Sequence, residues 1–139
     1  RRLRNDDADE VGRIYTAITR KPVGVDFRRI VADHAEREDS ACFVAEIGGK
    51  VVGFMITYIL TAGFGMSESA WIATMGVSPD QMGQGIGAAL AQETFDFYRS
   101  RGIENVYTSV RWDSTDMLSF FKTLGFDRSN FINLRKVLD

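Results

Sequence analysis

The residues with the clearest chemical potential form a glycine-rich stretch in the middle of the chain. It runs from Met75 to Leu90 and reads MGVSPDQMGQGIGAAL. Glycines at 83, 85 and 87 remove Cβ atoms where a ligand could approach the backbone. A helix expected directly after them would add unpaired N–H groups and the positive end of its dipole. This combination predicts an anion site, most naturally for phosphate.

Two common phosphate-binding loops fit this stretch poorly. A P-loop requires Lys and then Ser or Thr after its last glycine, whereas two alanines follow Gly87. A Rossmann loop follows its strand directly. The spacing of Gly83, Gly85 and Ala88 matches that fingerprint, but residues 78–82 separate the glycines from the preceding apolar segment. The P-loop is therefore excluded, and a Rossmann-type nucleotide binder is kept as a weaker alternative.

The stretch resembles the acyl-CoA loop of the GCN5-related N-acetyltransferases, the GNAT superfamily. Their pattern is V-x-P, then Arg or Gln, and then G-x-G/A before a helix. This chain agrees at Val77, Pro79, Gly83, Gly85, Gly87 and Leu90, and it departs at Met82, where the family usually has Arg or Gln. The resemblance implies that acetyl-CoA binds to Met75, Gly76, Val77, Met82, Gly83, Gln84, Gly85, Ile86, Gly87 and Ala88.

The strand before the loop has its own expected role. In the family it splays from its neighbour, and the pantetheine arm of CoA pairs with its backbone like a peptide. The corresponding residues here are Met75 to Val77. Gly76 is expected to ease a bulge at that place.

A second block, residues 110–126, is similar to the V-R-x-D-N-x-x-A-x-x-F-Y-x-x-L-G-F segment of the same family. Eight positions agree: Val110, Arg111, Asp113, Leu118, Phe120, Leu124, Gly125 and Phe126. The departures are Ser114 for Asn, Met117 for Ala and Phe121 for Tyr. Ser114 and Phe121 are expected to contact the cofactor. The family Tyr often protonates the departing CoA thiolate, which a phenylalanine cannot do.

The implied reaction is direct attack of an amine on the acetyl thioester. The amine must lose a proton, and Glu68 and Asp113 are the candidate bases. Tyr107, Ser114 or water could replace the missing acid. A backbone N–H near Val77 would polarise the carbonyl. Because thiols ionise near a pKa of ~8.5, the acid is helpful rather than obligatory.

Two further reactive residues are expected to be structural. His34 is the only histidine and falls on a predicted helical stripe, so packing against the sheet is favoured over a role as general base. Cys42 lies in a predicted strand and is interpreted as a small core residue.

These residues need a framework of alternating strands and helices. The expectation is an α/β (α+β) GNAT fold: a mixed, mostly antiparallel central sheet of six to seven strands, splayed at its central strands and flanked by about four helices. Periodicity and turn residues predict helices starting near Asp7 and Asp26, one ending near Ser100, and one over Thr115–Leu124. They predict strands over Arg1–Arg4, Ala41–Ile47, Val51–Leu60, Ala70–Val77, Val106–Val110 and Phe131–Leu138.

The acceptor pocket is expected from the least regular segments, residues 19–25, 61–69 and 127–131. The middle segment suits a lid that faces the substrate, although an ordinary surface loop is as good a reading. Many amino-terminal acetylases of the family carry Glu where this chain has Ser109, which argues against a protein N-terminus as acceptor.

Composition sets broad limits. A chain of 139 residues with 45% hydrophobic content predicts one globular domain over 1–139. The net charge of −2 gives no reason to expect nucleic acid or a membrane as partner. A single cysteine suits the cytoplasm. No metal is expected, and a homodimer is a possible oligomeric state. An N-terminal piece is expected to be missing because the chain begins at Arg1. The function predicted is acetyl transfer from acetyl-CoA to an amine of a small molecule or protein; the alternative is a non-catalytic acyl-CoA-binding module.

Overall fold

The computed structural model describes residues 1–19, 26–65 and 67–139. These residues form two compact units, Arg1–Thr108 and Ser109–Asp139. The expected single domain over 1–139 stays a prediction. Part of the expected acceptor pocket, residues 20–25, lies outside the described residues.

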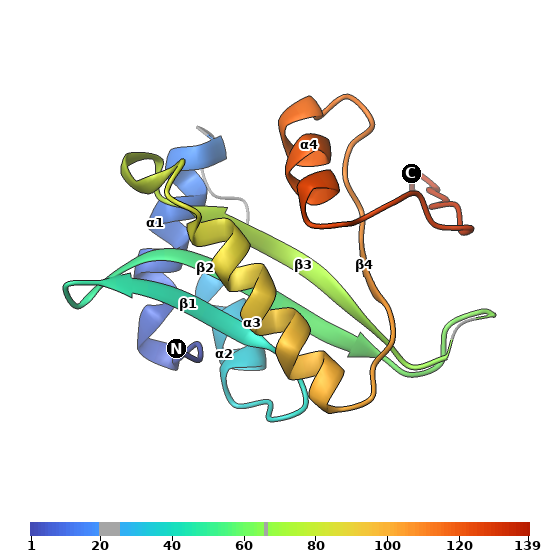
Figure 1. Cartoon of the computed structure of the whole chain (residues 1–139), viewed down its shortest axis with the longest axis horizontal. Coiled ribbons are helices and arrows are strands. Elements are labelled where there is room, and N and C mark those ends of the chain that lie inside the picture. Colours follow the sequence, from blue (N-terminus) through green and yellow to red (C-terminus); the bar gives the residue numbers. More distant parts are fainter. Residues whose placement is uncertain (20–25, 66) are drawn as a thin grey trace. The chain divides into compact units, whose positions relative to one another are not determined.

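The first unit contains a mixed sheet in the order β1-β2-β3-β4 (Figure 1). Neighbouring strands β1, β2 and β3 are antiparallel, whereas β4 runs parallel to β3. The described residues thus give a sheet of four strands, and the expected six to seven are not formed. The elements in chain order are η1 (Asn5–Asp7), α1 (Ala8–Thr19), α2 (Phe27–Ala35), β1 (Cys42–Ile47), β2 (Lys50–Leu60), β3 (Ser69–Val77), η2 (Pro79–Gln81), α3 (Ile86–Ser100) and β4 (Val106–Thr108).

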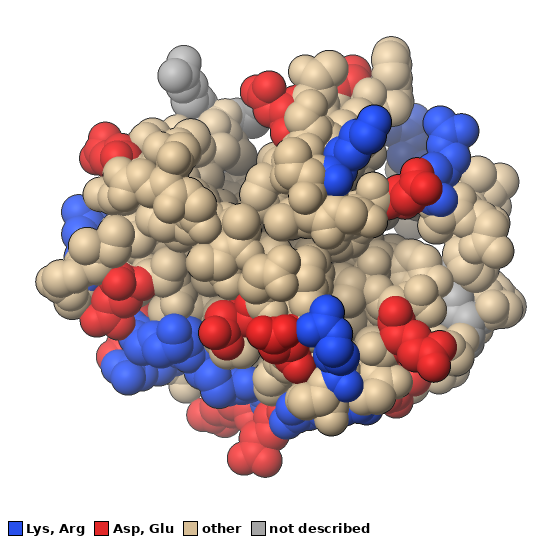
Figure 2. Space-filling model, viewed as in Figure 1, with Lys and Arg blue, Asp and Glu red and all other residues tan. Residues whose placement is uncertain are grey.

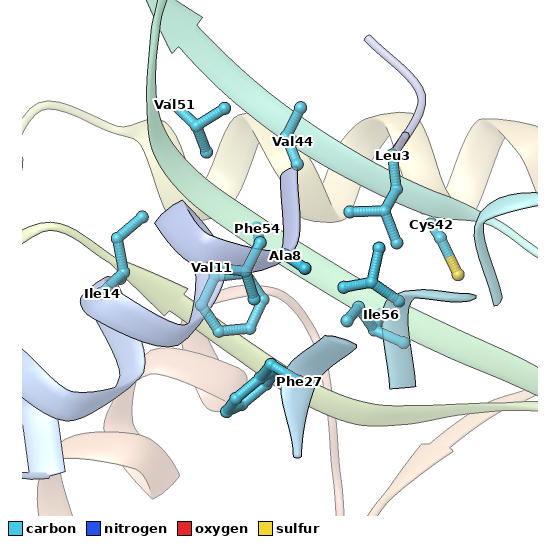
Figure 3. Close-up of a cluster of buried hydrophobic side chains, with 11 residues drawn as sticks. Leu3, Ala8, Val11, Ile14, Phe27, Cys42, Val44, Val51, Phe54 and Ile56 are labelled. Atoms are coloured by element: carbon cyan, nitrogen blue, oxygen red, sulfur yellow. The ribbon is translucent and has the colours of Figure 1, made fainter. Parts of the chain in front are cut away.

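Helices cover both faces of this sheet. In Figure 1, α3 crosses one face and α1 and α2 lie behind the other. The apolar stripe of α1 and α2 packs onto alternate residues of β1 and β2, which gives the core cluster in Figure 3. Its members are Leu3, Ala8, Val11, Ile14, Phe27, Val31, Cys42, Val44, Val51, Phe54 and Ile56. Burial raises the pKa of the Cys42 thiol, which agrees with its interpretation as a core residue.

Two bulges interrupt the strand registers near the site, one at Val52 of β2 and one at Ala73 of β3. Along β2 and β3 the register passes from Thr57↔Ile72 to Ile56↔Thr74, so Ala73 is the extra residue. Gly76 lies beyond this bulge in regular register with Phe54. The expectation that Gly76 eases a bulge is therefore wrong. A Cβ at this position would lie 2.8 Å from Ile18 Cδ1 and 2.9 Å from the Phe54 ring, so close packing is what requires glycine.

The expected first strand is reduced to a single bridge. Arg2 pairs with Phe43, and the bonds Leu3 N–H to Cys42 O and Val44 N–H to Arg1 O, both 2.9 Å, flank that pair. These bonds tie the start of the chain to β1, but they do not extend into a ladder. The prediction of a strand over Arg1–Arg4 is correct in location and wrong in extent.

The second unit contains α4 (Thr115–Thr123), which confirms the helix expected there. Its N-cap is Ser114, and Gly125, with φ of +92°, follows its end. The Phe121 ring packs against Phe120 and Phe126, with centroids 5.3 and 5.1 Å apart. Residues 131–138 have no strand structure, so the expected last strand is wrong. Among the helices of the described residues, none has the length and apolar content needed to cross a bilayer.

Candidate functional site

The glycine-rich loop has the geometry that an anion site needs. Gly83 and Gly85 adopt φ of +81° and +79°, in the left-handed region that favours glycine. A Cβ on either residue would have no atom within 4 Å, so space beside the backbone is open. Gly85 is the N-cap of α3 and no side chain caps the helix. The first helical N–H groups, from Ile86 to Ala88, therefore point toward that space with the positive end of the dipole.

Backbone contacts hold this loop against the sheet. The register of β1 and β2 skips Val52, whose carbonyl accepts a hydrogen bond of 2.8 Å from Ser78 N–H. The Ser78 carbonyl accepts in turn from Gln81 N–H at 2.8 Å, which closes the turn of η2. On the other side of the loop, Ile86 lies over Gly53, since a Cβ there would be 3.0 Å from Ile86 Cγ2. The loop is thus fixed by β2 at both of its ends.

The segment that forms β3, the loop and most of α3 carries no cationic side chain. The sequence has no Lys or Arg between Lys50 and Arg99, a segment that contains β3, the loop and most of α3. On the face drawn in Figure 2, no blue side chain lies over the start of α3. The side chain at the departing position, Met82, is 54% exposed. Any anion bound here is held by N–H groups and the helix dipole rather than by ion pairs with residues of this segment.

The strand that leads into the loop has one open edge in its second half. β3 pairs with β4 only over Ala70–Ile72, whereas its pairing with β2 continues to Val77. From the bulge at Ala73 onward, no described strand pairs with the edge that β4 has left. Met75 to Val77 lie along this edge, and their expected contact with the cofactor stays a prediction. An extended chain with amide groups could pair with that edge.

The three candidate catalytic side chains lie in different settings. Glu68 is exposed and directly precedes β3. Tyr107, on β4, is half-buried and stacks on Trp71 with centroids 5.1 Å apart. Asp113 lies in the second unit, where both of its carboxylate oxygens accept from Arg111 at 3.0 Å. The Arg111 guanidinium holds the pKa of the Asp113 carboxyl below its usual value, which makes Asp113 the weaker base.

The remaining candidates divide between the two units. Residues 75–77 and 82–88 come together in the first unit, whereas Ser114 and Phe121 belong to the second. The Ser114 hydroxyl makes no bond that caps α4, and Phe121 is part of the aromatic contact described above. Their expected contact with the cofactor stays a prediction.

His34 lies in the last turn of α2. Burial is the main cause that lowers the pKa of its imidazole, and the positive charge of Arg37 lowers it further. No described residue bonds to its buried Nδ1. Within the described residues, no group of three His, Cys, Asp or Glu side chains is placed to hold a metal ion.

Sequence reasoning missed two residues that position the loop. Gly53 gives Ile86 room, and the carbonyl of Val52 anchors Ser78. A glycine inside the otherwise apolar strand β2 was a usable signal, because such a glycine marks a close approach. The role of Val52 depends on a skipped residue in the register, which no side-chain pattern reveals.

Comparison with known proteins gives this geometry a family. A family model described as "Acetyltransferase (GNAT) family" matches residues 8–126. A mycothiol acetyltransferase of Saccharomonospora viridis is 35% identical over 89 residues, 61% of this chain and 29% of that protein. The ribosomal protein bS18-alanine N-acetyltransferase of Escherichia coli K12 is 27% identical over 81 residues, 58% of this chain and 51% of that protein. The chain thus spans about half or less of the length of these relatives.

The fold has a close match among solved structures. An aminoglycoside acetyltransferase from an uncultured soil metagenomic sample, crystallised with trehalose, superposes with a TM-score of 0.81. The two sequences are 22% identical, and the match covers 100% of this chain and 95% of the other. The likeness supports the GNAT fold, with fewer strands than expected. The family model spans most of the chain and both of its motifs, and the chain belongs to the acetyltransferase (GNAT) family.

Proposed function

We propose that this protein transfers an acetyl group from acetyl-CoA to a primary amine by direct attack. The observation that carries the proposal is the loop at the start of α3, in which two left-handed glycines and an uncapped helix N-terminus lie beside the end of β3. Phosphate groups of the co-substrate fit that loop, and its peptide-like arm fits the open edge of Met75 to Val77. The family uses acetyl-CoA as co-substrate, which agrees with this assignment.

In the proposed reaction the amine nitrogen forms a bond to the acetyl carbonyl carbon, and the bond from that carbon to sulfur breaks. The electron pair of the broken bond leaves with the thiolate. A backbone N–H of β3 polarises the carbonyl oxygen, which requires no particular side chain. Glu68 or Asp113, directly or through water, accepts the proton of the amine. Tyr107, Ser114 or water supplies a proton to the thiolate.

A second candidate function is a non-catalytic acyl-CoA-binding module. Phe121, which stands where the family has its acid, favours this alternative. It shares the loop geometry with the enzyme and predicts tight binding without turnover. Release of free thiol in the presence of amines separates the two functions.

The experiment is calorimetric titration with acetyl-CoA, CoA and NAD of the wild-type protein and Gly85→Glu. The substitution adds an anion to the open space of the loop and strains a residue at φ of +79°. We expect acetyl-CoA and CoA to bind and the variant to bind them at least about a hundredfold more weakly, because one added charge repels the phosphates and the side chain fills the site.

Gly102→Glu is the matched control. Gly102 has φ of +76°, equally open surroundings, and a place just beyond the other end of α3. It adds the same strain and charge far from the loop, and its affinity for acetyl-CoA is expected to stay within about twofold of wild type. Equal losses in both variants would show that the effect is on folding. Binding of NAD without CoA species would contradict the proposal.

The coarser properties of the protein complete the proposal. We retain a cytoplasmic location, a small-molecule or protein amine as acceptor, and the absence of nucleic-acid, membrane and metal partners. The proposal includes both a monomer and a homodimer as oligomeric states. Size-exclusion chromatography with light scattering would decide between monomer and dimer.

A further inference from the structure

Three aromatic side chains form a continuous row across the sheet of the first unit. Tyr58 on β2 pairs in register with Trp71 on β3, which pairs with Tyr107 on β4. The rings of Tyr58 and Trp71 are nearly parallel, at 13° and 6.5 Å between centroids, and those of Trp71 and Tyr107 lie at 24° and 5.1 Å. We name these three residues the aromatic row. Register and ring geometry together show that it is one stacked unit.

The aromatic row lies on the sheet face that α1 and α2 cover elsewhere. Along β2, Phe54 and Ile56 belong to the core cluster on that face, and Tyr58 follows them in the same alternation. The row itself lies outside that cluster, and all three residues are half-buried. Trp71 is further fixed by its indole N–H, which donates to Ser69 Oγ at 3.1 Å. Part of an ordered aromatic surface therefore stays accessible.

The aromatic row lies close to the place where the proposed reaction occurs. An arm that pairs with Met75 to Val77 and starts at the loop has its thioester end beyond Met75, beside the bulge at Ala73. Trp71 is two residues further along the same strand. At about 3.3 Å per residue, the spacing from Ala73 to Trp71 is roughly 7 Å. A short amine that reaches the thioester can therefore rest its other end on the row.

The orientation of the rings decides which chemical group fits. Side chains stand roughly perpendicular to a sheet, so rings stacked from strand to strand turn their edges, not their faces, away from it. The C–H edge of the central ring, Trp71, carries positive potential and attracts the negative face of another ring in an edge-to-face contact. A cation prefers a ring face, and both faces of the central ring, Trp71, are turned toward a neighbouring tyrosine ring. The row therefore suits the aromatic ring of an acceptor better than the distal ammonium group of a diamine.

We infer that the acceptor is a small arylalkylamine, a primary amine on a short chain, whose ring rests on the aromatic row Tyr58–Trp71–Tyr107. This inference rests on the proposed acetyl transfer and names its substrate class. Trp71 of the row lies on β3, the strand beside the proposed position of the thioester, and a molecule on the row is therefore assigned as the acceptor amine. The ring binds on the row, and the amine points along β3 toward the bulge.

The test compares three amines of similar length: 2-phenylethylamine, n-hexylamine and 1,5-diaminopentane. Free CoA thiol is followed with a thiol reagent; the buried Cys42 does not interfere with that readout. We expect kcat/KM for 2-phenylethylamine to exceed that for n-hexylamine by about tenfold, the order of an aromatic contact. Trp71→Leu should reduce this ratio to near one, whereas Trp71→Phe, which keeps a ring, should retain most of it.

Each outcome has one meaning. Equal rates for phenyl and hexyl amines, a preference for the diamine, or a preference that survives Trp71→Leu would overturn the inference while leaving acetyl transfer intact. Turnover restricted to a peptide that begins with phenylalanine would overturn it in favour of a protein acceptor. Absence of thiol release with every amine would contradict the proposed function instead. If Trp71→Leu fails to fold, Tyr58→Leu, at one end of the row, is compared with wild type in the same ratio of the two amines.

Discussion

The two family motifs of this chain differ in what their residues do. In the loop before α3, the residues that match the family act through the backbone: Gly83 and Gly85 provide left-handed turns, and Pro79 starts the turn of η2. In the segment around α4, the family residues that carry chemistry are side chains, and there Phe121 replaces the tyrosine acid. The first motif keeps the backbone geometry of its glycines, and the second departs from the family at the position of the expected acid.

This difference indicates where variation is tolerated. A backbone N–H is supplied by any residue that fits the turn, so the substitution at Met82 removes a side chain without removing the amides of the loop. A general acid needs one particular group at one place. We therefore expect binding of acetyl-CoA to be robust and the rate of transfer to depend on few side chains. Single substitutions in each motif can separate the two contributions.

The strongest test separates the two candidate bases. Glu68 precedes β3 in the first unit, whereas Asp113 is engaged by Arg111 in the second. Because Arg111 lowers the pKa of Asp113, we expect Glu68→Gln to reduce kcat/KM about a hundredfold, the lower range of general-base effects, and Asp113→Asn to reduce it less than about fivefold. Steady-state kinetics over roughly pH 6 to 9 give both values of kcat/KM.

The pH profile provides the control for this pair. Loss of a base removes the rise of kcat/KM with pH, while a purely structural loss lowers the whole profile evenly. A larger effect of Asp113→Asn than of Glu68→Gln would assign the base to the second unit. Acetyl-CoA affinity should change little in either variant.

The next effect distinguishes two kinds of glycine within the first motif. Gly76 is required by packing, because an added Cβ would meet Phe54 at 2.9 Å, whereas Gly83 is surrounded by open space at φ of +81°. We expect Gly76→Ala to lower the free energy of unfolding by about 2 kcal/mol through overpacking. Gly83→Ala should cost about 1 kcal/mol through strain and should also weaken acetyl-CoA binding.

Urea denaturation and calorimetry on the same samples check both quantities. Gly48→Ala is the matched control for strain, since Gly48 has φ of +58° and open surroundings in the turn between β1 and β2. If Gly76→Ala weakened binding as much as Gly83→Ala, the assignment of Gly76 to packing alone would fail.

The sequence predicted the elements whose patterns are local and missed those that depend on a partner. Helix α4 and strand β3 were placed within a residue or two, because caps, glycines and periodicity mark them directly. Residues 131–138 alternate as a strand should, yet they form none. Alternation shows that a segment can pair but not that an edge is available to it, and β4 is only Val106–Thr108.

The site divides in the same way. Motif spacing located the loop and the strand before it, since glycine positions encode backbone conformation. The reason that position 76 requires glycine was misjudged. Its close contact with Phe54 joins residues of two strands and depends on the register between them. The aromatic row escaped notice for the same reason: Tyr58, Trp71 and Tyr107 are far apart in sequence and meet only through two strand registers.

A gain of function is expected from the second motif. Phe121→Tyr restores the hydroxyl that the family places there, and we expect it to raise kcat about tenfold, below the usual range for a general acid because water already serves in part. The gain should disappear as pH rises toward the pKa of tyrosine, near ~10. Phe120→Tyr, which adds a hydroxyl to the neighbouring ring, is the control and should leave kcat within about twofold. No gain in Phe121→Tyr would place the acid elsewhere, with Tyr107 as the next candidate.

The smallest expected effect restores a side chain to the first motif. Met82→Arg introduces a guanidinium beside a loop whose own segment has no cation, and a charge-assisted contact with phosphate should tighten acetyl-CoA binding. Because Met82 is 54% exposed, the gain should be only about fivefold and should fall as salt is raised from roughly 0.05 to 0.5 M. Met82→Leu controls for loss of the thioether and should match wild type. Calorimetry at the two salt concentrations decides the matter: a gain that persists at high salt would mean that Arg supports the loop rather than the phosphate, and a gain far above tenfold would mean that the backbone alone holds the co-substrate less firmly than the geometry of Gly83 and Gly85 implies.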